Sequence, residues 1–271
     1  MIIGDYEFDF KETHVVGVLN VTPDSFSDGG NFFSAKKAIA RAKQMIKQGA
    51  TIIDLGGEST KPGSDSISEK EELNRVLPVI KALFGKISVP ISIDSCKPGV
   101  VAKCLEAGAS LVNDVTGLRD TKMVDVVAKH NVPVIIMHMQ GNPRDMQKNP
   151  SYKDVVEDIV DFFTDRIKTA EKKGIHDIIL DPGIGFGKTV EHNLQILNRL
   201  GEFCRLERPI MVGSSRKSFI GKLTGAEVDK RLPGTIASVA ISIMHGADLV
   251  RVHDVEECRQ AAMITDAIKN A

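Results

Sequence analysis

The stretch Leu105–Asp114, LEAGASLVND, joins the end of a helical pattern to an apolar run through a Gly-Ala pair. A glycine directly after the last helical residue is typical of the short loops that lead from a helix into a buried strand. The same arrangement recurs in KQGAT at 47–51 and in MHGAD at 244–248. This repetition indicates that helices and strands alternate along the chain.

Eight apolar runs rich in Val, Ile and Leu are spread over the chain, as expected for parallel strands buried on both faces. They are VVGVLN (15–20), TIIDLGG (51–57), PISID (90–94), SLVND (110–114), PVIIMHM (133–139), DIILD (177–181), PIMVGS (209–214) and DLVRVH (248–253). Eight strand–helix units in about 250 residues indicate an α/β protein of the TIM barrel type. A doubly wound open sheet is the alternative, although five or six strands are more usual there.

Helical patterns fill the spaces between these runs. Tyr152–Lys173 carries one apolar face and is followed by Gly174, a suitable residue for the end of a helix. Thr235–His245 is apolar nearly all round, which predicts burial on more than one side. Residues 1–13 are expected to form a small hairpin that closes the bottom of the barrel, and His138–Ser151 a mobile loop on its active face. No linker divides the 271 residues, so we expect one domain.

Composition excludes several classes of function. A net charge of -1 gives no general attraction to nucleic acids or anionic lipids, although a local cluster of cations can still bind a small anion. No apolar run approaches ~18 residues, and the first ten residues lack the basic segment of a signal peptide. The four cysteines show no C-x-x-C spacing, so we expect reduced, mostly buried thiols in a cytoplasmic protein.

Polar groups end every predicted strand, the position that carries the chemistry in a TIM barrel. They are Asn20; Asp54 and Glu58; Asp94; Asn113 and Asp114; His138; Asp181; Ser214, Ser215, Arg216 and Lys217; and Arg251, His253 and Asp254. Capping of the next helix explains some of them, as it can at Ser215 and Asp254. It does not explain the alternation within ISID and VRVH, where the polar residue comes before the turn.

Several familiar motifs fail on inspection. GFGKT at 185–189 resembles the end of a phosphate-binding P-loop, but Pro182 stands where the first glycine is required. GIGFG does not match G-x-G-x-x-G. The seven histidines are scattered without a His-x-His pair, which argues against a zinc hydrolase. Lys217 lies beyond its strand, which argues against a Schiff-base aldolase.

The remaining polar groups divide by charge. The last two strands deliver cations where TIM barrels commonly bind phosphate: Lys217, Arg251 and His253. Arg216 either joins them or braces its loop. Acceptors come from strands across the mouth: Asp94, Asn113 and Asp181. Because a carboxylate can accept two neighbouring N–H bonds, the residues alone predict a nitrogen heterocycle that carries a phosphate.

Three motifs then identify a family: GVLNVTPDSFSDGG at 17–30, IIDLGGESTKPG at 52–63 and GSSRKSFIG at 213–221. With ISIDS, VND, LDPGIGFGKT and RVHDV, they resemble the dihydropteroate synthases of folate synthesis at all eight strand ends. The resemblance implies condensation of 6-hydroxymethyl-7,8-dihydropterin pyrophosphate with 4-aminobenzoate, which releases pyrophosphate. It also implies Mg²⁺ as cofactor, inhibition by sulfonamides, a homodimer formed through the last helices, and no nucleic-acid or membrane partner.

The resemblance also implies roles for individual residues. Asn113 and Asp181 would bind the pyrimidine edge of the pterin, Asp94 its ring N–H groups, and Lys217 its carbonyl oxygen and N5. Arg251 would stack on the ring and, with His253 and Asn20, hold the pyrophosphate, while Asn20 would also bind Mg²⁺. The residues expected to border the aminobenzoate are Thr60, Pro62, Phe186 and Ser218. Asp28 and Lys61 would complete the catalytic set with Asp94 and Lys217.

One departure from the family pattern is visible in the second motif. The family usually reads S-T-R-P-G, whereas this chain has Ser59-Thr60-Lys61-Pro62-Gly63. Lysine keeps the charge but lacks the planar fork of arginine, so a weaker grip on an anion is expected rather than lost activity. The first loop, LNVTPDSFSDGG at 19–30, is expected to act as a lid that excludes water.

Two alternatives remain open from the sequence. A pterin-binding methyltransferase barrel would share the pterin-facing Asp and Asn but would have no use for the pyrophosphate residues. A non-catalytic paralogue would bind pterin without turnover, which the intact Asn20, Asp94, Asp181 and Lys217 argue against.

Overall fold

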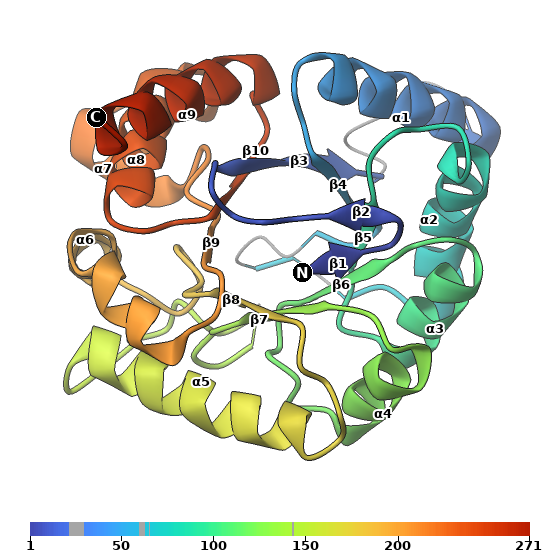
Figure 1. Cartoon of the computed structure of the whole chain (residues 1–271), viewed down its shortest axis with the longest axis horizontal. Coiled ribbons are helices and arrows are strands. Elements are labelled where there is room, and N and C mark those ends of the chain that lie inside the picture. Colours follow the sequence, from blue (N-terminus) through green and yellow to red (C-terminus); the bar gives the residue numbers. More distant parts are fainter. Residues whose placement is uncertain (22–29, 60–62, 65, 143) are drawn as a thin grey trace.

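The computed structural model describes residues 1–21, 30–59, 63–64, 66–142 and 144–271, with only the backbone for 30–35. Eight parallel strands form one sheet in the order β8-β7-β6-β5-β4-β3-β10-β9 (Figure 1). They are β3 (His14–Asn20), β4 (Ile52–Gly56), β5 (Ile91–Asp94), β6 (Leu111–Asp114), β7 (Val134–Met137), β8 (Ile178–Asp181), β9 (Met211–Val212) and β10 (Leu249–Val252). Seven of them lie within the predicted runs, and β3 begins one residue before its run, at His14.

The two edges of this sheet meet. Leu180 at the end of β8 forms a parallel bridge with Ile210, just before β9, and its N–H donates to the Pro209 carbonyl at 2.9 Å. The sheet is therefore nearly closed into a barrel. This confirms the predicted (β/α)8 fold, and the doubly wound open sheet is wrong.

Helices surround the barrel as one outer layer (Figure 1). The α-helices are α1 (Gly30–Lys47), α2 (Glu69–Leu83), α3 (Pro98–Glu106), α4 (Thr121–His130), α5 (Val155–Glu171), α6 (Val190–Asn198), α7 (Ser218–Thr224), α8 (Leu232–Met244) and α9 (Val255–Lys269). The described residues also include the 3₁₀ segments η2 (Leu200–Leu206) and η3 (Val228–Lys230). In the described part of the chain, none of these helices has the length and apolarity needed to cross a membrane.

Helix α5 begins three residues later than the sequence pattern indicated. The Asp154 carboxylate accepts from the backbone N–H groups of Val156 and Glu157 at 2.9 and 3.1 Å, and so satisfies donors that the first turn leaves free. Helix α8 was expected to be buried on more than one side, and within the single chain this expectation was wrong. Its Ser238, Val239 and Ser242 are buried, but Ile241 and Met244 are 48% and 47% exposed.

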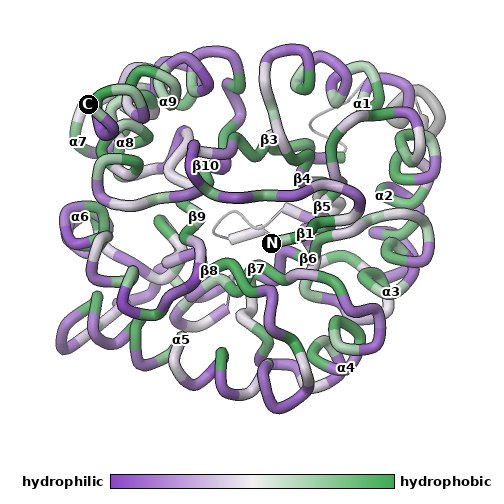
Figure 2. Tube along the Cα trace, in the orientation of Figure 1, coloured by the Kyte–Doolittle hydropathy of each residue, from purple (hydrophilic) through white to green (hydrophobic). Residues whose placement is uncertain are grey.

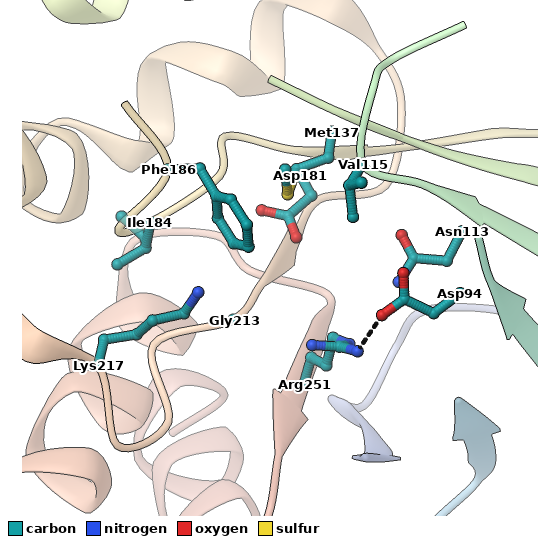
Figure 3. Close-up of a pocket in the computed structure, with 10 residues that line it drawn as sticks. All are labelled: Asp94, Asn113, Val115, Met137, Asp181, Ile184, Phe186, Gly213, Lys217 and Arg251. Atoms are coloured by element: carbon teal, nitrogen blue, oxygen red, sulfur yellow. Dashed lines mark hydrogen bonds and ion pairs between the residues drawn. The ribbon is translucent and has the colours of Figure 1, made fainter. Parts of the chain in front are cut away.

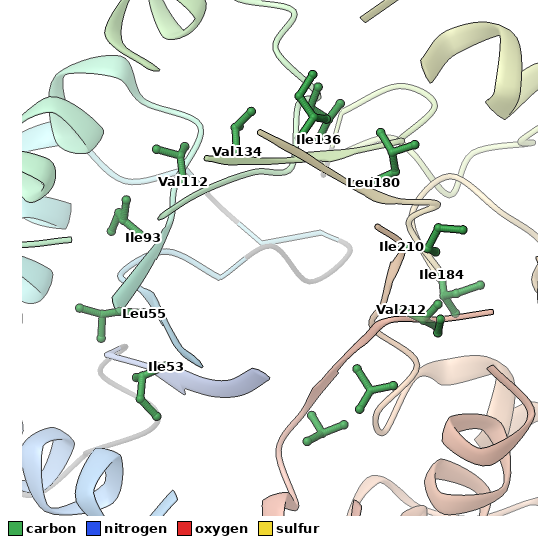
Figure 4. Close-up of a cluster of buried hydrophobic side chains, with 14 of the residues drawn as sticks. Ile53, Leu55, Ile93, Val112, Val134, Ile136, Leu180, Ile184, Ile210 and Val212 are labelled. Carbon is green, nitrogen blue, oxygen red and sulfur yellow. The ribbon is translucent and has the colours of Figure 1, made fainter. Parts of the chain in front are cut away.

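The main hydrophobic core lies between barrel and helices. Side chains such as Ile53, Leu55, Ile93, Val112 and Ile136 point away from the barrel axis and form a ring against the helix layer (Figure 4). Figure 2 shows the same division along the backbone, with hydrophobic strands inside and mixed helices outside. The cysteines only partly follow expectation, since Cys104 and Cys258 are buried but Cys96 is half-buried and Cys204 exposed; all four are free thiols.

A second, smaller core fills the bottom of the barrel. It gathers inward-pointing strand residues: Val16, Ile52, Leu111, Ile135, Ile179, Met211 and Leu249. The predicted N-terminal hairpin, β1 (Ile2–Ile3) with β2 (Tyr6–Glu7), covers it, and the fully buried Ile3 and nearly buried Phe8 complete the cluster. The hairpin therefore closes the end of the barrel opposite the strand ends that carry the polar groups.

Truncation of the hairpin side chain that enters the barrel should be costly. Ile3→Ala is expected to destabilise the protein by about 2–5 kcal/mol, because it leaves a cavity in a closed core. The matched control is Ile2→Ala at the adjacent position, which is 55% exposed and should change stability by less than about 0.5 kcal/mol. Urea unfolding midpoints measure both, and equal shifts would show that the hairpin does not seal the barrel.

Candidate active site

The polar layer of the site lies directly above the bottom core. Side chains of a strand alternate between its two faces, so residues two apart share a face. Ile52 is followed on the inner face by Asp54, Leu111 by Asn113, Ile179 by Asp181 and Leu249 by Arg251. Each of these four strands therefore closes the barrel with an apolar residue and then presents a polar group above it.

Asn113, Asp181 and Arg251 line a hollow of about 320 Å³ that is open to solvent, whereas Asp54 lies beneath it (Figure 3). Its walls are Asp94, Asn113, Val115, Met137, Asp181, Ile184, Phe186, Gly213, Lys217 and Arg251. The structure thus brings together six of the predicted site residues, which come from β5, β6, β8, β10 and the segments after β8 and β9.

Arg251 is the central cation of the hollow. Its Nε donates to Asp54 Oδ2 at 2.6 Å, and its Nη2 donates to Asp94 Oδ2 at 2.6 Å. Asp54 is fully buried below the hollow, and its Oδ2 also accepts from Asn113 Nδ2 at 3.1 Å. One carboxylate that lines no part of the hollow therefore orients two side chains that do.

Three acceptor oxygens remain for a ligand. Because Asn113 Nδ2 is turned toward Asp54, the Asn113 amide oxygen faces the hollow (Figure 3). Asp94 Oδ1 has no hydrogen-bond partner in the described structure. Asp181 Oδ1 accepts from the Gly183 N–H at 2.7 Å, and a Cβ built on Gly213 would lie 4.0 Å from Asp181 Oδ2. Two carboxylates and one amide oxygen therefore converge on the same volume.

Burial controls the protonation of this layer. It raises the pKa of Asp94 to about 7, against the opposing effect of Arg251 and with a further increase from Asp54. Burial also raises the pKa of Asp181, while the Gly183 N–H, Lys217 and Arg251 lower it. Burial lowers the pKa of Lys217 to about 8, with Arg251 adding to the effect.

The loop after β8 supports the other wall. The Lys217 ammonium lies 3.9 Å from the centre of the Phe186 ring, a cation–π contact. Gly183 has φ +70°, and a Cβ there would lie 2.0 Å from the His138 carbonyl oxygen, so only glycine permits this approach of two loops. The buried Lys188 fixes the contact by donating to the Phe186 carbonyl at 3.0 Å, with its Nζ also 3.0 Å from His138 Nδ1. The lysine of GFGKT thus anchors a loop, and its ammonium points at protein groups.

The ends of β9 and β10 are joined by short contacts. Arg216 forms a two-pronged ion pair with Asp254, one bond of which is Nε to Oδ2 at 2.9 Å. It therefore braces its loop, which decides between the two roles left open by the sequence. Asp254 stands at the start of α9 but accepts from Arg216 rather than capping the helix. Ser215 contacts His253 and does not cap a helix either.

Asn20 at the end of β3 provides the oxygen expected to bind Mg²⁺. A Cβ built on Gly56 would lie 3.3 Å from Asn20 Oδ1 and 3.6 Å from Asp94 Oδ2, so both oxygens border one small space. The described residues contain no group of three His, Cys, Asp or Glu side chains that could hold a metal by themselves. Mg²⁺ usually takes one or two protein oxygens and completes its coordination shell with water and phosphate oxygens. The donor set at Asn20 fits such an ion.

The remaining predicted site residues do not line the hollow or lie outside the described part of the chain. Ser218 is exposed at the first position of α7. Asp28, Thr60, Lys61 and Pro62 lie outside the described residues, as does most of the predicted lid. Asp54 and Lys188 had no predicted role, although the inward register of Asp54 above Ile52 is a signal that the sequence contains.

Comparisons with known proteins agree with this geometry. The family model described as pterin binding enzyme matches residues 16–253. The dihydropteroate synthase of Synechocystis sp. is 46% identical, over 98% of this chain and 94% of that protein. The one from Clostridium beijerinckii is 47% identical, over 99% of both chains.

Solved structures give the same result. A Yersinia pestis dihydropteroate synthase in a sulfonamide drug complex superposes with a TM-score of 0.95, at 42% identity, over 100% of this chain and 99% of that one. The Clostridium difficile enzyme with pteroic acid gives 0.92 at 50% identity, over 97% and 99%. A Xanthomonas albilineans enzyme with 4-aminobenzoic acid gives 0.91 at 41% identity, over 97% and 95%.

Fold, hollow and family model together define a pterin-binding enzyme built on a TIM barrel. Within that class, identity of 46–47% over nearly the whole chain is decisive. The chain belongs to the dihydropteroate synthases, transferases of folate synthesis.

Proposed function

We propose that the protein condenses 6-hydroxymethyl-7,8-dihydropterin pyrophosphate with 4-aminobenzoate to give 7,8-dihydropteroate and pyrophosphate. The observation that carries the proposal is the hollow in which three acceptor oxygens face two cations. A dihydropterin has a flat edge rich in N–H donors, and its pyrophosphate substituent requires cations. Relatives crystallised with pteroic acid and with 4-aminobenzoic acid support the same pair of substrates.

Recognition of the pterin follows from the positions of the acceptors. Asp181 and Asn113 accept from the N–H groups of the pyrimidine edge, and Asp94 accepts from those of the dihydropyrazine ring. Lys217 donates to the carbonyl oxygen and N5. The guanidinium of Arg251, held flat by Asp54 and Asp94, stacks against the ring face. A ligand without the N–H edge would leave buried acceptors unpaired, which makes the site selective.

Departure of pyrophosphate is the difficult step. In this proposal Arg251, His253 and Asn20 hold the pyrophosphate oxygens, and Mg²⁺ bound at Asn20 would supply charge neutralisation for the leaving group. The C–O bond to pyrophosphate breaks with its electron pair on oxygen, and the methylene carbon becomes a cation delocalised over the pterin. The ionised Asp94 stabilises this cation electrostatically.

The second substrate then completes the reaction. The amino nitrogen of 4-aminobenzoate attacks the methylene carbon, the C–N bond forms, and the nitrogen loses one proton. Phe186, which lines the hollow, provides an apolar wall for the aromatic ring. In this proposal Thr60, Pro62 and Ser218 border the same ring. Asp28 and Lys61 complete the site in this proposal, and sulfonamides compete with 4-aminobenzoate for it.

The direct test is release of pyrophosphate from the pterin substrate with and without 4-aminobenzoate. The proposal requires release that depends on 4-aminobenzoate, together with formation of 7,8-dihydropteroate. A methyltransferase-type barrel would release no pyrophosphate. A non-catalytic paralogue would bind the pterin, as calorimetry would show, without turnover.

Pterin affinity should depend on pH on both sides of neutrality. Asp94 must be ionised to accept an N–H bond, and burial raises its pKa to about 7, so affinity is lost as the pH falls through 7. Lys217 must be protonated to donate, and burial lowers its pKa to about 8, so affinity is lost as the pH rises through 8. Titration calorimetry with one pterin ligand should therefore give a maximum between about 7 and 8.

Substitutions assign the two limbs of this profile. Asp94→Asn should bind more weakly and lose the acidic limb, while Lys217→Met should lose the alkaline limb. Because the ligand is the same in all three proteins, its own titration cancels in the comparison. An acidic limb that persists in Asp94→Asn would assign it to another acceptor, such as Asp181, whose pKa burial also raises.

We further propose a cytoplasmic homodimer that associates through α8 and α9. The two helices lie side by side (Figure 1) and expose five large apolar side chains: Ile241, Met244, Met263, Ile264 and Ile268. Clustered exposed apolar residues of this kind are typical of association surfaces. Four free thiols suit a reducing compartment.

The dimer proposal has a simple test. At micromolar concentration, sedimentation should give twice the 29.5 kDa mass of the chain. Ile264→Glu, at a side chain that is 65% exposed, should shift the protein toward monomer because a charge would be buried in the interface. A monomeric unaltered protein would contradict the proposal.

A further inference from the structure

His253 is held by two side chains at three of its atoms. Its backbone N–H donates to Ser215 Oγ at 3.2 Å, and its carbonyl oxygen accepts from Arg41 Nη2 of α1 at 2.9 Å. Its ring Nδ1 lies 3.1 Å from the same Ser215 Oγ. Ser215 is buried at the turn that follows β9, so its position does not depend on solvent. One hydroxyl group, that of Ser215, therefore contacts both the backbone and the ring of His253.

The direction of the ring hydrogen bond follows from the chemistry of that hydroxyl. A serine hydroxyl has one proton to donate and two lone pairs to accept with. Ser215 Oγ already accepts from the His253 N–H, and among the described residues Nδ1 is the only acceptor with which its proton bonds. If the hydroxyl accepted both bonds, its own proton would be buried without a partner, so we assign the hydroxyl as the donor and Nδ1 as unprotonated.

If the His253 imidazole is neutral, its single ring proton must lie on Nε2. Burial lowers the pKa of His253 to about 4, and Arg251 and Arg216 add to the effect, so the imidazole is neutral at neutral pH. A neutral imidazole with an unprotonated Nδ1 carries its proton on Nε2. In the described structure Nε2 makes no hydrogen bond, so its N–H is available to a ligand.

We propose that Ser215 is a positioning residue that fixes His253 as the Nε2–H tautomer, so that the histidine donates to the pyrophosphate oxygens. The ligand assignment rests on the function proposed above. The opposite tautomer would turn a lone pair toward an oxyanion, which repels it. The serine thus makes a neutral ring donate an N–H to an anion, and no positive charge is added to those of Arg251 and Lys217.

The first measurement reads the tautomer itself. Nitrogen-15 NMR of the ring in the ligand-free full-length protein should show His253 with Nε2 protonated and Nδ1 bare. In Ser215→Ala, the loss of the hydroxyl proton should produce a mixture of tautomers or a different ring environment. A proton found on Nδ1 of the unaltered protein would overturn the proposal, whether or not the enzyme is active.

The second measurement connects the tautomer to the ligand. Calorimetric titration with inorganic pyrophosphate and Mg²⁺ should show roughly tenfold weaker binding by Ser215→Ala, the usual effect of losing one charge-assisted hydrogen bond. In turnover, KM for the pterin pyrophosphate should rise while KM for 4-aminobenzoate stays the same. Unchanged pyrophosphate affinity in Ser215→Ala would contradict the proposal.

The adjacent serine provides a matched control. Ser214 is also buried, but its Oγ accepts from Ser238 Oγ at 2.9 Å and makes no contact with His253. Ser214→Ala should therefore keep the His253 tautomer and the pyrophosphate affinity of the unaltered protein. A failure of the unaltered protein to bind pyrophosphate would count against the proposed function instead, and the NMR result would still decide the assignment of Ser215.

Discussion

The site depends on one buried ion pair, between the Arg251 guanidinium and the Asp54 carboxylate at 2.6 Å. Asp54 is completely buried, so its charge would be costly without the cation and the Asn113 amide that it binds. Arg251 also forms an ion pair with Asp94, at the end of β5, the strand next to the one that carries Asp54. The carboxylate thereby decides which atom of Asn113 faces the ligand and in which plane the guanidinium lies. The acceptors and cations of the hollow are arranged around a residue that does not line it.

Most of the fold could be predicted from the sequence, because a strand buried on both faces is an unbroken run of Val, Ile and Leu. All eight runs, and the hairpin at the bottom, are where this pattern placed them. Element ends were less certain, since they depend on particular contacts such as the capping of α5 by Asp154. The expected burial of α8 on several sides failed because periodicity reports that a face is apolar and does not tell whether the same chain covers it.

The site was predictable where a residue acts from a strand end, and not where it acts through a contact between distant segments. Asp94, Asn113, Asp181 and Arg251 share one hollow, as their places at the ends of four strands indicated, and Lys217 joins them from the segment after β9. The anchoring role of Lys188 needs the carbonyls of two loops, and the brace between Arg216 and Asp254 needs two strands side by side. Such pairings join residues far apart in sequence, so no local pattern contains them.

The affinity of an Asp54→Asn variant for a pterin tests this account most directly, because Asp54 is not proposed to touch the ligand. Arg251 Nε and Asn113 Nδ2 both donate to Asp54 Oδ2, so an asparagine whose amide oxygen takes that place keeps both acceptor contacts. It removes the negative charge that holds the Arg251 guanidinium, and it places an NH₂ group where the buried Oδ1 has no hydrogen-bond partner among the described residues. Asp114→Asn is the control, since among the described residues that buried carboxylate bonds only to its own loop, at Thr116 and Leu118. Calorimetry should show pterin binding at least about tenfold weaker in Asp54→Asn and nearly unchanged in Asp114→Asn. Equal affinity in Asp54→Asn and the unaltered protein would show that the ion pair does not organise the site.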